Sequence, residues 1–352
     1  MVIGAHICEE NTVQCKLLFA LKTVFAFAPE TRIILFTTSS LSNLPHNCLQ
    51  VTISPKPKNT LLLYYWYKYN LPKLIIKYNI NTFISNVGIL ASDKTLAQFL
   101  FVENQRCLTE KNSFFKTRIS EAISKAKKIF ITDEFLSEQF KKKFPKQVNK
   151  LQYLNFNVSE HTILFTEEEL EAIKDKYTGG FGYYLFTIDT SSKAHVVTVL
   201  KSFSQLKKWQ KTSIKLVISF EKEIDENLLP DLKNYKYKND VVLIKKTSTN
   251  KLPLTASAFA YIFLGDYNFK ENVYDALRYN VPIIATDNID NHLLFNQAVV
   301  YTAISVDGIA AQLQNIYKDE MFKKQLLQKA DNFLANFDNQ INSQKFIDAL
   351  SN

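Results

Sequence analysis

The chain has 352 residues, of which 46% are hydrophobic and 22% charged, and its formal net charge at pH 7 is +9. This length exceeds what one hydrophobic core usually supports, so we expect a globular protein of two domains. No apolar run approaches the roughly 20 residues that cross a bilayer, and the amino terminus shows no signal peptide, so we expect a cytoplasmic protein without a membrane span.

The first 150 residues alternate between short β-branched runs and segments with helical periodicity. We expect strands at residues 2–5, 32–37, 82–85, 99–102 and 128–132, and helices at residues 14–27 and 71–78. Such alternation is typical of a parallel sheet with helices on both faces. The sequence therefore predicts a Rossmann-like domain in this half of the chain.

The alternation stops between residues 150 and 182. An acidic helix is expected at Glu167–Lys176, and three of the seven glycines follow it, at Gly179, Gly180 and Gly182. We interpret this stretch as the connection between an amino-terminal domain at residues 1–165 and a carboxy-terminal domain at residues 166–352.

From residue 183 the alternation resumes. We expect strands at residues 183–187, 214–219, 241–245, 261–264 and 281–285, a helix at residues 196–209 and a helical tail after Ser305. The last helix could pack back on the first domain. The predicted fold class is α/β, with two Rossmann-like domains that face each other across a cleft.

Residues 263–288 form the most informative block of the chain. A helix at residues 271–278 would turn Val273, Ala276 and Leu277 inward and keep Asp275 off that face, near the preceding loop. The short β-branched run that follows is typical of a buried parallel strand.

This block resembles the donor-binding signature of glycosyltransferase family 4. In that signature a glutamate, seven other residues and a second glutamate precede an alanine and a Gly-Val-Pro sequence. Asp275 stands at the second glutamate, residues 280–282 replace Gly-Val-Pro by Asn-Val-Pro, and Thr286 matches the final Ser or Thr. The first glutamate is replaced by Tyr267, and Asp266 lies one position too early.

Weaker similarities to the same family follow in order along the chain. They lie at residues 66–72, 126–135, 154–155, 183–203 and 215–218. Together they resemble a divergent member of glycosyltransferase family 4. The resemblance implies the GT-B fold and transfer of a sugar from a nucleotide donor, usually with retention of the anomeric configuration, without a bound metal and without a cofactor.

The resemblance also implies where the donor diphosphate would bind. A departing diphosphate develops negative charge, which cations and a helix amino terminus can stabilise. Lys193 stands where the family has arginine, while Ala194 and His195 replace its lysine and asparagine. Only one of the family's two cations remains at these positions. Lysine cannot make the two parallel hydrogen bonds that arginine makes with a phosphate. Lys270, which with Asn268 replaces two glycines of the family pattern, could supply the missing charge.

Two carboxylates complete the predicted site. In the family the second glutamate holds the donor ribose, a role that Asp275 could take with a side chain one methylene shorter. Val102-Glu103-Asn104 stands where the family often has Val-Ile-His-Asp, so the acceptor-side histidine is missing. Glu103 could act as an acid or hydrogen-bond acceptor there, but it would repel a leaving phosphate unless it is protonated or paired. The candidate catalytic residues are Glu103, Asp266 and Tyr267, and the candidate substrate-binding residues are Lys193, Asn268, Lys270, Asp275 and Thr286.

Two of these candidate residues and two histidines also have simpler interpretations. Asp275 could be a solvated helix residue, and Lys193 could be an exposed loop lysine. His195 is more simply the start of a helix than a catalyst. His6, near the end of the first strand, is explained as well by a core or surface position as by a place in the cleft.

The net positive charge is compatible with nucleic acid, an anionic membrane or phosphorylated substrates. No nucleic-acid-binding module accompanies it, so no nucleic-acid partner is expected. A helix near residues 135–146 has phenylalanines on one face and lysines on the other, so it could contact an anionic membrane at the inner face. An ordinary amphipathic helix with a solvated basic face is the favoured interpretation.

The four cysteines have neither metal-site nor disulfide spacing. They lie at Cys8, Cys15, Cys48 and Cys107, and we expect free thiols.

The sequence thus predicts a glycosyltransferase that moves a sugar from a nucleotide-sugar donor to a glycan or lipid-linked acceptor, in the synthesis of a bacterial surface polysaccharide. The alternative is a non-catalytic relative that binds a glycan or a partner enzyme. It arises because one glutamate, one phosphate-site lysine and the acceptor-side histidine of the family are replaced. The same replacements predict low activity or an unusual donor.

Overall fold

The structure is a computed structural model of the chain. It describes all residues except 8–14, 42–43, 58, 94, 106–107, 109–112, 157–163, 189–192, 221–231, 266, 338 and 352, and only the backbone at residues 25–27, 60, 113–115, 193 and 268. The chain forms two compact units, one of Met1–Glu160 with Phe337–Asn352 and the other of His161–Asn336. In the described part, no helix is long and apolar enough to cross a membrane.

The first unit is built on a seven-stranded sheet in which all neighbouring strands are parallel. Its strand order is β3-β2-β1-β4-β5-β6-β7. The strands are β1 (Val2–His6), β2 (Arg32–Thr37), β3 (Cys48–Thr52), β4 (Thr82–Ser85), β5 (Ala97–Val102), β6 (Lys128–Ile131) and β7 (Leu151–Tyr153). The central strands are buried on both faces, as expected of short β-branched and aromatic runs in a parallel sheet.

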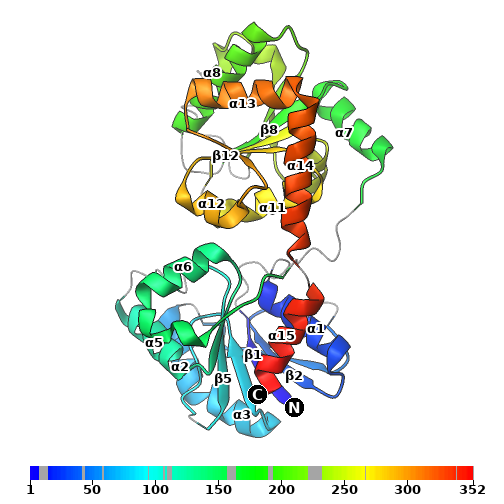
Figure 1. The fold of residues 1–352 in the computed structure, drawn as a ribbon. Coiled ribbons are helices and arrows are strands. Elements are labelled where there is room, and N and C mark those ends of the chain that lie inside the picture. The colour runs from blue at the N-terminus through cyan, green and yellow to red at the C-terminus, as the bar shows by residue number, and fades with distance from the viewer. Residues whose placement is uncertain are drawn as a thin grey trace. The chain divides into compact units, whose positions relative to one another are not determined.

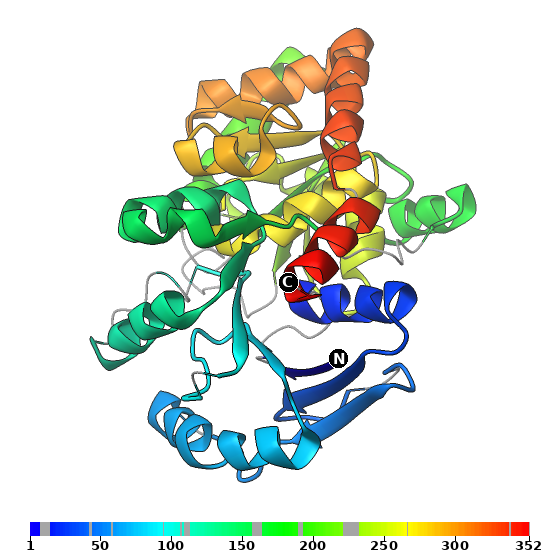
Figure 2. The ribbon, with the colours of Figure 1, turned by 60° about the horizontal axis from the view of Figure 1, so that its bottom comes forward.

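Helices cover both faces of this first sheet. They are α1 (Lys16–Phe27), α2 (Thr60–Tyr69), α3 (Leu71–Tyr78), α5 (Ser113–Lys125), α6 (Glu134–Lys143) and α15 (Asn339–Ser351), with a 3-10 turn at Pro145–Lys150. Figure 1 shows α1 and α15 on one face and α2, α5 and α6 on the other. The last helix, α15, lies beside α1 in both views (Figures 1 and 2).

The second unit is built on a six-stranded parallel sheet of order β10-β9-β8-β11-β12-β13. Its strands are β8 (Tyr183–Ile188), β9 (Lys215–Phe220), β10 (Val241–Lys245), β11 (Ala260–Phe263), β12 (Ile283–Thr286) and β13 (Val300–Thr302). Its helices are α7 (Glu167–Thr178), α8 (Lys193–Trp209), α10 (Lys251–Ala256), α11 (Lys270–Arg278), α12 (Ile289–Phe295), α13 (Val306–Lys318) and α14 (Glu320–Ala335), with 3-10 turns at Lys238–Asp240 and Tyr267–Phe269.

Local sequence signals explain where α7 begins and ends. The Thr166 hydroxyl accepts a hydrogen bond from the Glu169 amide, and the Glu169 carboxylate accepts one from the Thr166 amide, which is a capping box. The helix ends at Gly179, whose φ of 65° suits glycine best. This glycine cluster therefore terminates a helix inside the second unit.

The predicted fold class is confirmed, because both sheets are parallel and each predicted strand overlaps an observed one. The sequence missed the edge strands β3, β7 and β13. Two of them have three residues, and β3 carries Gln50 and Thr52 with no fully buried position. Such short, half-exposed strands lack the continuous apolar run that identified the central ones.

The packing of α15 generates a stability prediction. The Phe346 ring is fully buried and contacts the rings of Phe101, Phe130 and Phe156. Phe346→Ala should lower the free energy of unfolding of the first unit by about 3–5 kcal/mol, because it leaves a cavity in this core. Lys345→Ala, on the exposed side of the same helix, should change it by less than about 0.5 kcal/mol. Urea denaturation measures both, and equal effects would contradict the role of α15 in this core.

Candidate functional site

In both sheets the strand order reverses once, between β1 and β4 and between β8 and β11. At such a reversal the connections leave toward opposite faces and open a crevice at the carboxyl ends of the strands, where open α/β sheets bind ligands. The predicted residues follow strands at these two edges. Glu103 follows β5, Lys193 follows β8, Tyr267 and Lys270 follow β11, and Thr286 ends β12.

At the edge of the first sheet, three buried polar side chains form a chain of hydrogen bonds. His6 ends β1, and its Nδ1 lies 2.6 Å from the Tyr67 hydroxyl. The same hydroxyl lies 3.0 Å from the Ser85 hydroxyl, at the end of β4. The sequence left the position of His6 open, and the structure places it in the core beside the strand reversal.

Glu103 caps the amino terminus of α1. Its Oε2 accepts hydrogen bonds from the backbone amides of Lys16, at 2.8 Å, and Leu17, at 3.4 Å. Its Oε1 accepts hydrogen bonds from the Asn86 side-chain amide and, at 3.5 Å, from the Cys15 thiol. A helix amino terminus is a favourable place for an anion, and here the protein's own carboxylate takes it.

Cys15 completes this cap. Its sulfur accepts a hydrogen bond from the Leu18 amide at 3.4 Å. Burial, and then the negative charge of Glu103, raise the pKa of the Cys15 thiol well above its ordinary value. The thiol therefore stays protonated and serves as a helix cap. Cys15 and Cys48 are both free thiols, while Cys8 and Cys107 lie outside the described residues.

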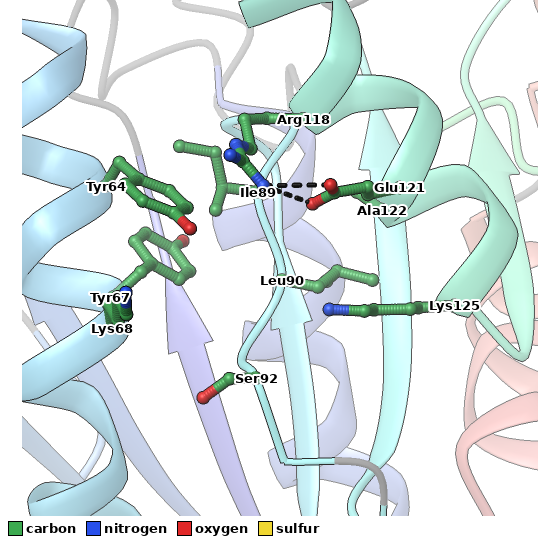
Figure 3. A pocket seen from close by; sticks show the side chains of 10 residues that line it. All are labelled: Tyr64, Tyr67, Lys68, Ile89, Leu90, Ser92, Arg118, Glu121, Ala122 and Lys125. Carbon is green, nitrogen blue, oxygen red and sulfur yellow. Dashed lines mark hydrogen bonds and ion pairs between the residues drawn. The ribbon is translucent and has the colours of Figure 1, made fainter. Parts of the chain in front are cut away.

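A pocket of about 110 Å³ lies beside Tyr67, the central residue of the hydrogen-bonded chain His6–Tyr67–Ser85 in the first unit. Figure 3 shows Tyr64 and Tyr67 of α2 pointing into it from one side, and Arg118, Glu121 and Lys125 of α5 from the other. Arg118 donates two hydrogen bonds to Glu121, at 2.7 and 2.8 Å, and its guanidinium lies 4.4 Å from the centre of the Tyr64 ring. Aromatic faces and charged groups of this kind can bind a polar ring.

At the edge of the second sheet, two helices begin after neighbouring strands. The helix α8 begins at Lys193 and α11 begins at Lys270. The amino terminus of a helix carries free backbone amides and partial positive charge, which suits a phosphate. Asp266 lies outside the described residues, and the side chains of Lys193 and Asn268 are also outside the described part. His195 is the third residue of α8 and is half-buried.

Tyr267 and Lys270 form a buried pair. The Lys270 ammonium donates a hydrogen bond to the Tyr267 hydroxyl and lies 3.8 Å from the centre of the Tyr267 ring. This geometry allows a cation–π interaction. Where the sequence comparison expected a glutamate, the chain therefore has an aromatic ring that holds a cation.

Asp275 is buried, with 5% of its surface exposed, between two cations. Lys251 Nζ lies 3.1 Å from its Oδ2, and Arg278 donates a hydrogen bond of 3.1 Å to its Oδ1. The interpretation of Asp275 as a solvated helix residue is therefore wrong. The two cations compensate the cost of burying the carboxylate and hold it in one orientation.

Thr286 presents an unused hydroxyl at the end of β12. Its backbone carbonyl accepts a hydrogen bond from the Asn291 side-chain amide at 2.9 Å. Its side-chain oxygen is buried and has no hydrogen-bond partner in the described part of the chain. A buried hydroxyl without a partner is uncommon and costs free energy, so this position suits a ligand contact.

The structure therefore brings the predicted residues together only in part. Tyr267 contacts Lys270, whereas Asp275 contacts Lys251 and Arg278, which the sequence analysis did not single out. Arg278 is three residues after Asp275 and could have been found by helical spacing. Lys251 lies on another helix, so no local pattern indicated it.

Comparison with solved structures finds the same fold along the whole chain. A glycosyltransferase from Rickettsia africae ESF-5 matches with a TM-score of 0.69 and 12% identity, over 100% of this chain and 99% of that one. WaaG, a glycosyltransferase involved in lipopolysaccharide biosynthesis, matches with 0.67 and 11%, over 99% of both chains. HepE from Anabaena, in complex with UDP-glucose, matches with 0.68 and 11%, over 100% and 99%.

Neither the models of protein families nor the curated protein sequences match this chain. The structural matches show a GT-B-like architecture of two Rossmann-like domains, a fold that the chain shares with nucleotide-sugar glycosyltransferases. Fold alone does not define an activity, which depends on the residues of the site.

The capping role of Glu103 can be tested by stability. Glu103→Ala should lower the free energy of unfolding of the first unit by about 1–3 kcal/mol, because the α1 amides and Asn86 lose a charged acceptor. Glu103→Gln should cost less, since its amide oxygen still accepts from the backbone. Urea denaturation measures the change in the free energy of unfolding. Hydrogen exchange of the first α1 amides measures how far the start of the helix is destabilised locally.

A matched control is Glu138→Ala, which removes a carboxylate that pairs at the surface with Lys141. That change should cost less than about 1 kcal/mol. If Glu103→Ala costs no more than Glu138→Ala and leaves α1 exchange unchanged, Glu103 is not a cap.

Proposed function

We propose that this protein is a glycosyltransferase that transfers a sugar from a nucleotide-sugar donor to a glycan or lipid-linked acceptor. The donor would bind at the carboxyl edge of the second sheet, and the acceptor would use the edge of the first. A bacterial surface polysaccharide is the proposed product class, retention of the anomeric configuration is the proposed outcome, and the proposed reaction uses no metal.

One observation carries this proposal. The chain matches HepE from end to end, and HepE was solved in complex with UDP-glucose. The match to WaaG, which is involved in lipopolysaccharide biosynthesis, supports the proposed product class. At the carboxyl edge of the second sheet, the chain carries the residues that resemble the donor-binding signature.

On the donor side, the proposed roles follow from position and charge. The amino termini of α8 and α11, with Lys193 and Lys270, would stabilise the charge on the departing diphosphate. Asp275, held by Lys251, would accept hydrogen bonds from the ribose hydroxyls. Thr286 would give its unpaired hydroxyl to the donor.

On the acceptor side, His6, Tyr67 and Ser85 offer a preformed set of hydrogen-bonding groups. Glu103 has both carboxylate oxygens engaged by α1 and by Asn86, so we assign it a positioning role at this edge. It would hold the start of α1 in place while the acceptor binds.

A second candidate function is a non-catalytic module that binds a glycan or a partner. One specific observation favours it. Two of the described charged groups that could assist transfer are already paired within their own unit, Lys270 with Tyr267 and Asp275 with Lys251 and Arg278. A nucleoside diphosphate would have to share or displace these contacts.

Nucleotide binding tests the donor site. Asp275→Ala should weaken binding of a nucleoside diphosphate by about 1.5–3 kcal/mol, or roughly ten- to a hundredfold, the range for hydrogen bonds to a charged group. Lys251→Met should weaken it less, because Arg278 still holds the carboxylate. Calorimetric titration with UDP, GDP and ADP measures these affinities.

Asp331→Ala is the control, since Asp331 is an exposed aspartate on α14 of the same unit. Asp275→Asn keeps the shape of the side chain and shows whether the fold is retained. Unchanged affinity in a folded Asp275→Ala variant would remove Asp275 from the site. Absence of any nucleotide binding by the native protein would favour the non-catalytic module.

The replaced residues generate a prediction about rate. Tyr267→Glu with Ala194→Lys should raise sugar transfer or donor hydrolysis, because it restores two charges that favour the transition state. Each could contribute about tenfold or more, at 1.36 kcal/mol per factor of ten. Ala194 is exposed, so its replacement should be tolerated. Tyr267→Phe with Ala194→Lys is the control for loss of the tyrosine hydroxyl.

The measurement is single-turnover transfer with a panel of nucleotide sugars. If the native protein already turns over a common nucleotide sugar rapidly and the double variant is slower, the replaced residues do not lower the activity of the site. Tyr267 and Lys270 would then belong to a differently arranged working site.

A further inference from the structure

The surface of α2 and α3 exposes an unusual number of large apolar side chains. Five of them have between 48 and 77% of their surface exposed: Leu61, Leu62, Tyr65, Tyr69 and Ile76. Single exposed apolar residues are common, but Leu62, Tyr65 and Tyr69 line one groove, and a group of this kind marks an interaction surface.

Three of these side chains form a stripe along α2, and Leu62 lies beside it on the same helix. Leu61, Tyr65 and Tyr69 are four residues apart, so they lie on the same side of the helix. The rings of Tyr65 and Tyr69 stack, with centres 6.0 Å apart and planes 11° apart. The opposite side of α2 is also apolar, because Trp66 and Tyr67 are buried in the core. A helix that is apolar on both sides needs a partner for its outer side.

The surroundings of the stripe are basic. The sequence contains no Asp or Glu between Glu30 and Asp93. Three exposed lysines lie on α2 and α3, at Lys68, Lys73 and Lys77. None of the three forms an ion pair with a described residue. The exposed apolar stripe is therefore accompanied by unneutralised positive charge.

A shallow groove continues the apolar surface. It has a volume of about 230 Å³ and lies between the loop that contains Pro57 and the side of α2 that carries Leu62, Tyr65 and Tyr69. Lys56 lies at the same groove. The groove has room for a small apolar group, and a cation is close to it.

We propose that α2 and α3 form a docking surface for an anionic phospholipid bilayer. Leucine and tyrosine side chains suit the interfacial region, where the rings contact acyl chains and the hydroxyls contact water. The lysines add attraction to anionic headgroups. The apolar side chains could insert into any bilayer, but the lysines gain attraction only from negatively charged headgroups, so the charge points to an anionic bilayer.

The helix α6 provides a contrast within the same unit. It also carries lysines, but Phe135, Leu136 and Phe140 are all buried in the core. The apolar side of α6 therefore has no part left to insert into a bilayer. The structure assigns membrane contact to α2 and α3 and leaves α6 as an ordinary amphipathic helix.

Docking on α2 would place the bilayer next to the acceptor edge of the first sheet. The same helix carries Tyr67, whose hydroxyl contacts His6 and Ser85 at that edge. For a lipid-linked acceptor, which rests on the proposed function, this arrangement would present the acceptor headgroup close to these polar groups. Binding to the bilayer itself requires neither donor nor transfer and can be measured without them.

The experiment is sedimentation of the full chain with phosphatidylcholine vesicles, with and without phosphatidylglycerol. The native protein should bind only the anionic vesicles. Lys68→Gln, Lys73→Gln and Lys77→Gln together should weaken binding on the order of a hundredfold, since each lysine near the surface contributes about a factor of five. Tyr65→Ser with Tyr69→Ser should weaken it by about tenfold or more.

The matched control is Lys141→Gln with Lys142→Gln and Lys146→Gln, which removes the same charge beside α6. It should retain most of the binding, and thermal unfolding checks that all variants are folded. Equal loss in the α6 control, or no binding by the native protein, would overturn the proposal. A dimer that the tyrosine variant abolishes, without vesicle binding, would assign the surface to a second copy and also overturn it.

Discussion

Parallel strand pairing with one reversal in each sheet is the constraint on which the rest of the structure depends. Parallel neighbours need crossover connections, and these are nearly always right-handed, so every strand ends at the same edge of its sheet. Between β1 and β4, and between β8 and β11, the order reverses. Each reversal brings residues from distant parts of the sequence to one edge, where the next helices begin. Glu103, Tyr267, Lys270 and Thr286, all within the described part, owe their position to this arrangement.

The two edges differ in how they treat negative charge. At the first, the amino terminus of α1 is capped by the carboxylate of Glu103. At the second, α8 and α11 begin at lysines, and the buried Thr286 hydroxyl has no hydrogen-bond partner among the described residues. An anionic ligand would therefore meet repulsion at the first edge and attraction at the second. This difference agrees with a nucleotide donor in the second unit and an uncharged acceptor group in the first.

The helix α2 links three features of the first unit. Its inner side supplies Tyr67 to the polar network, a second side supplies Tyr64 to a pocket, and its outer side exposes Tyr65 and Tyr69. Core packing usually leaves a helix with a polar outer side, because apolar surface in water costs free energy. The exposed tyrosines of α2 are therefore better explained by contact with a partner than by folding.

The sequence by itself determined the α/β class, the central strands and the block that ends at Thr286, because these depend on local periodicity. It could not determine which groups meet. Glu103 binds an amide 87 positions away, and Lys251 reaches Asp275 from another helix. Whether a carboxylate is a catalyst, a cap or a member of an ion pair depends on such distant partners. Only the tertiary structure decided this, because burial and pairing are properties of packed surfaces and not of local sequence.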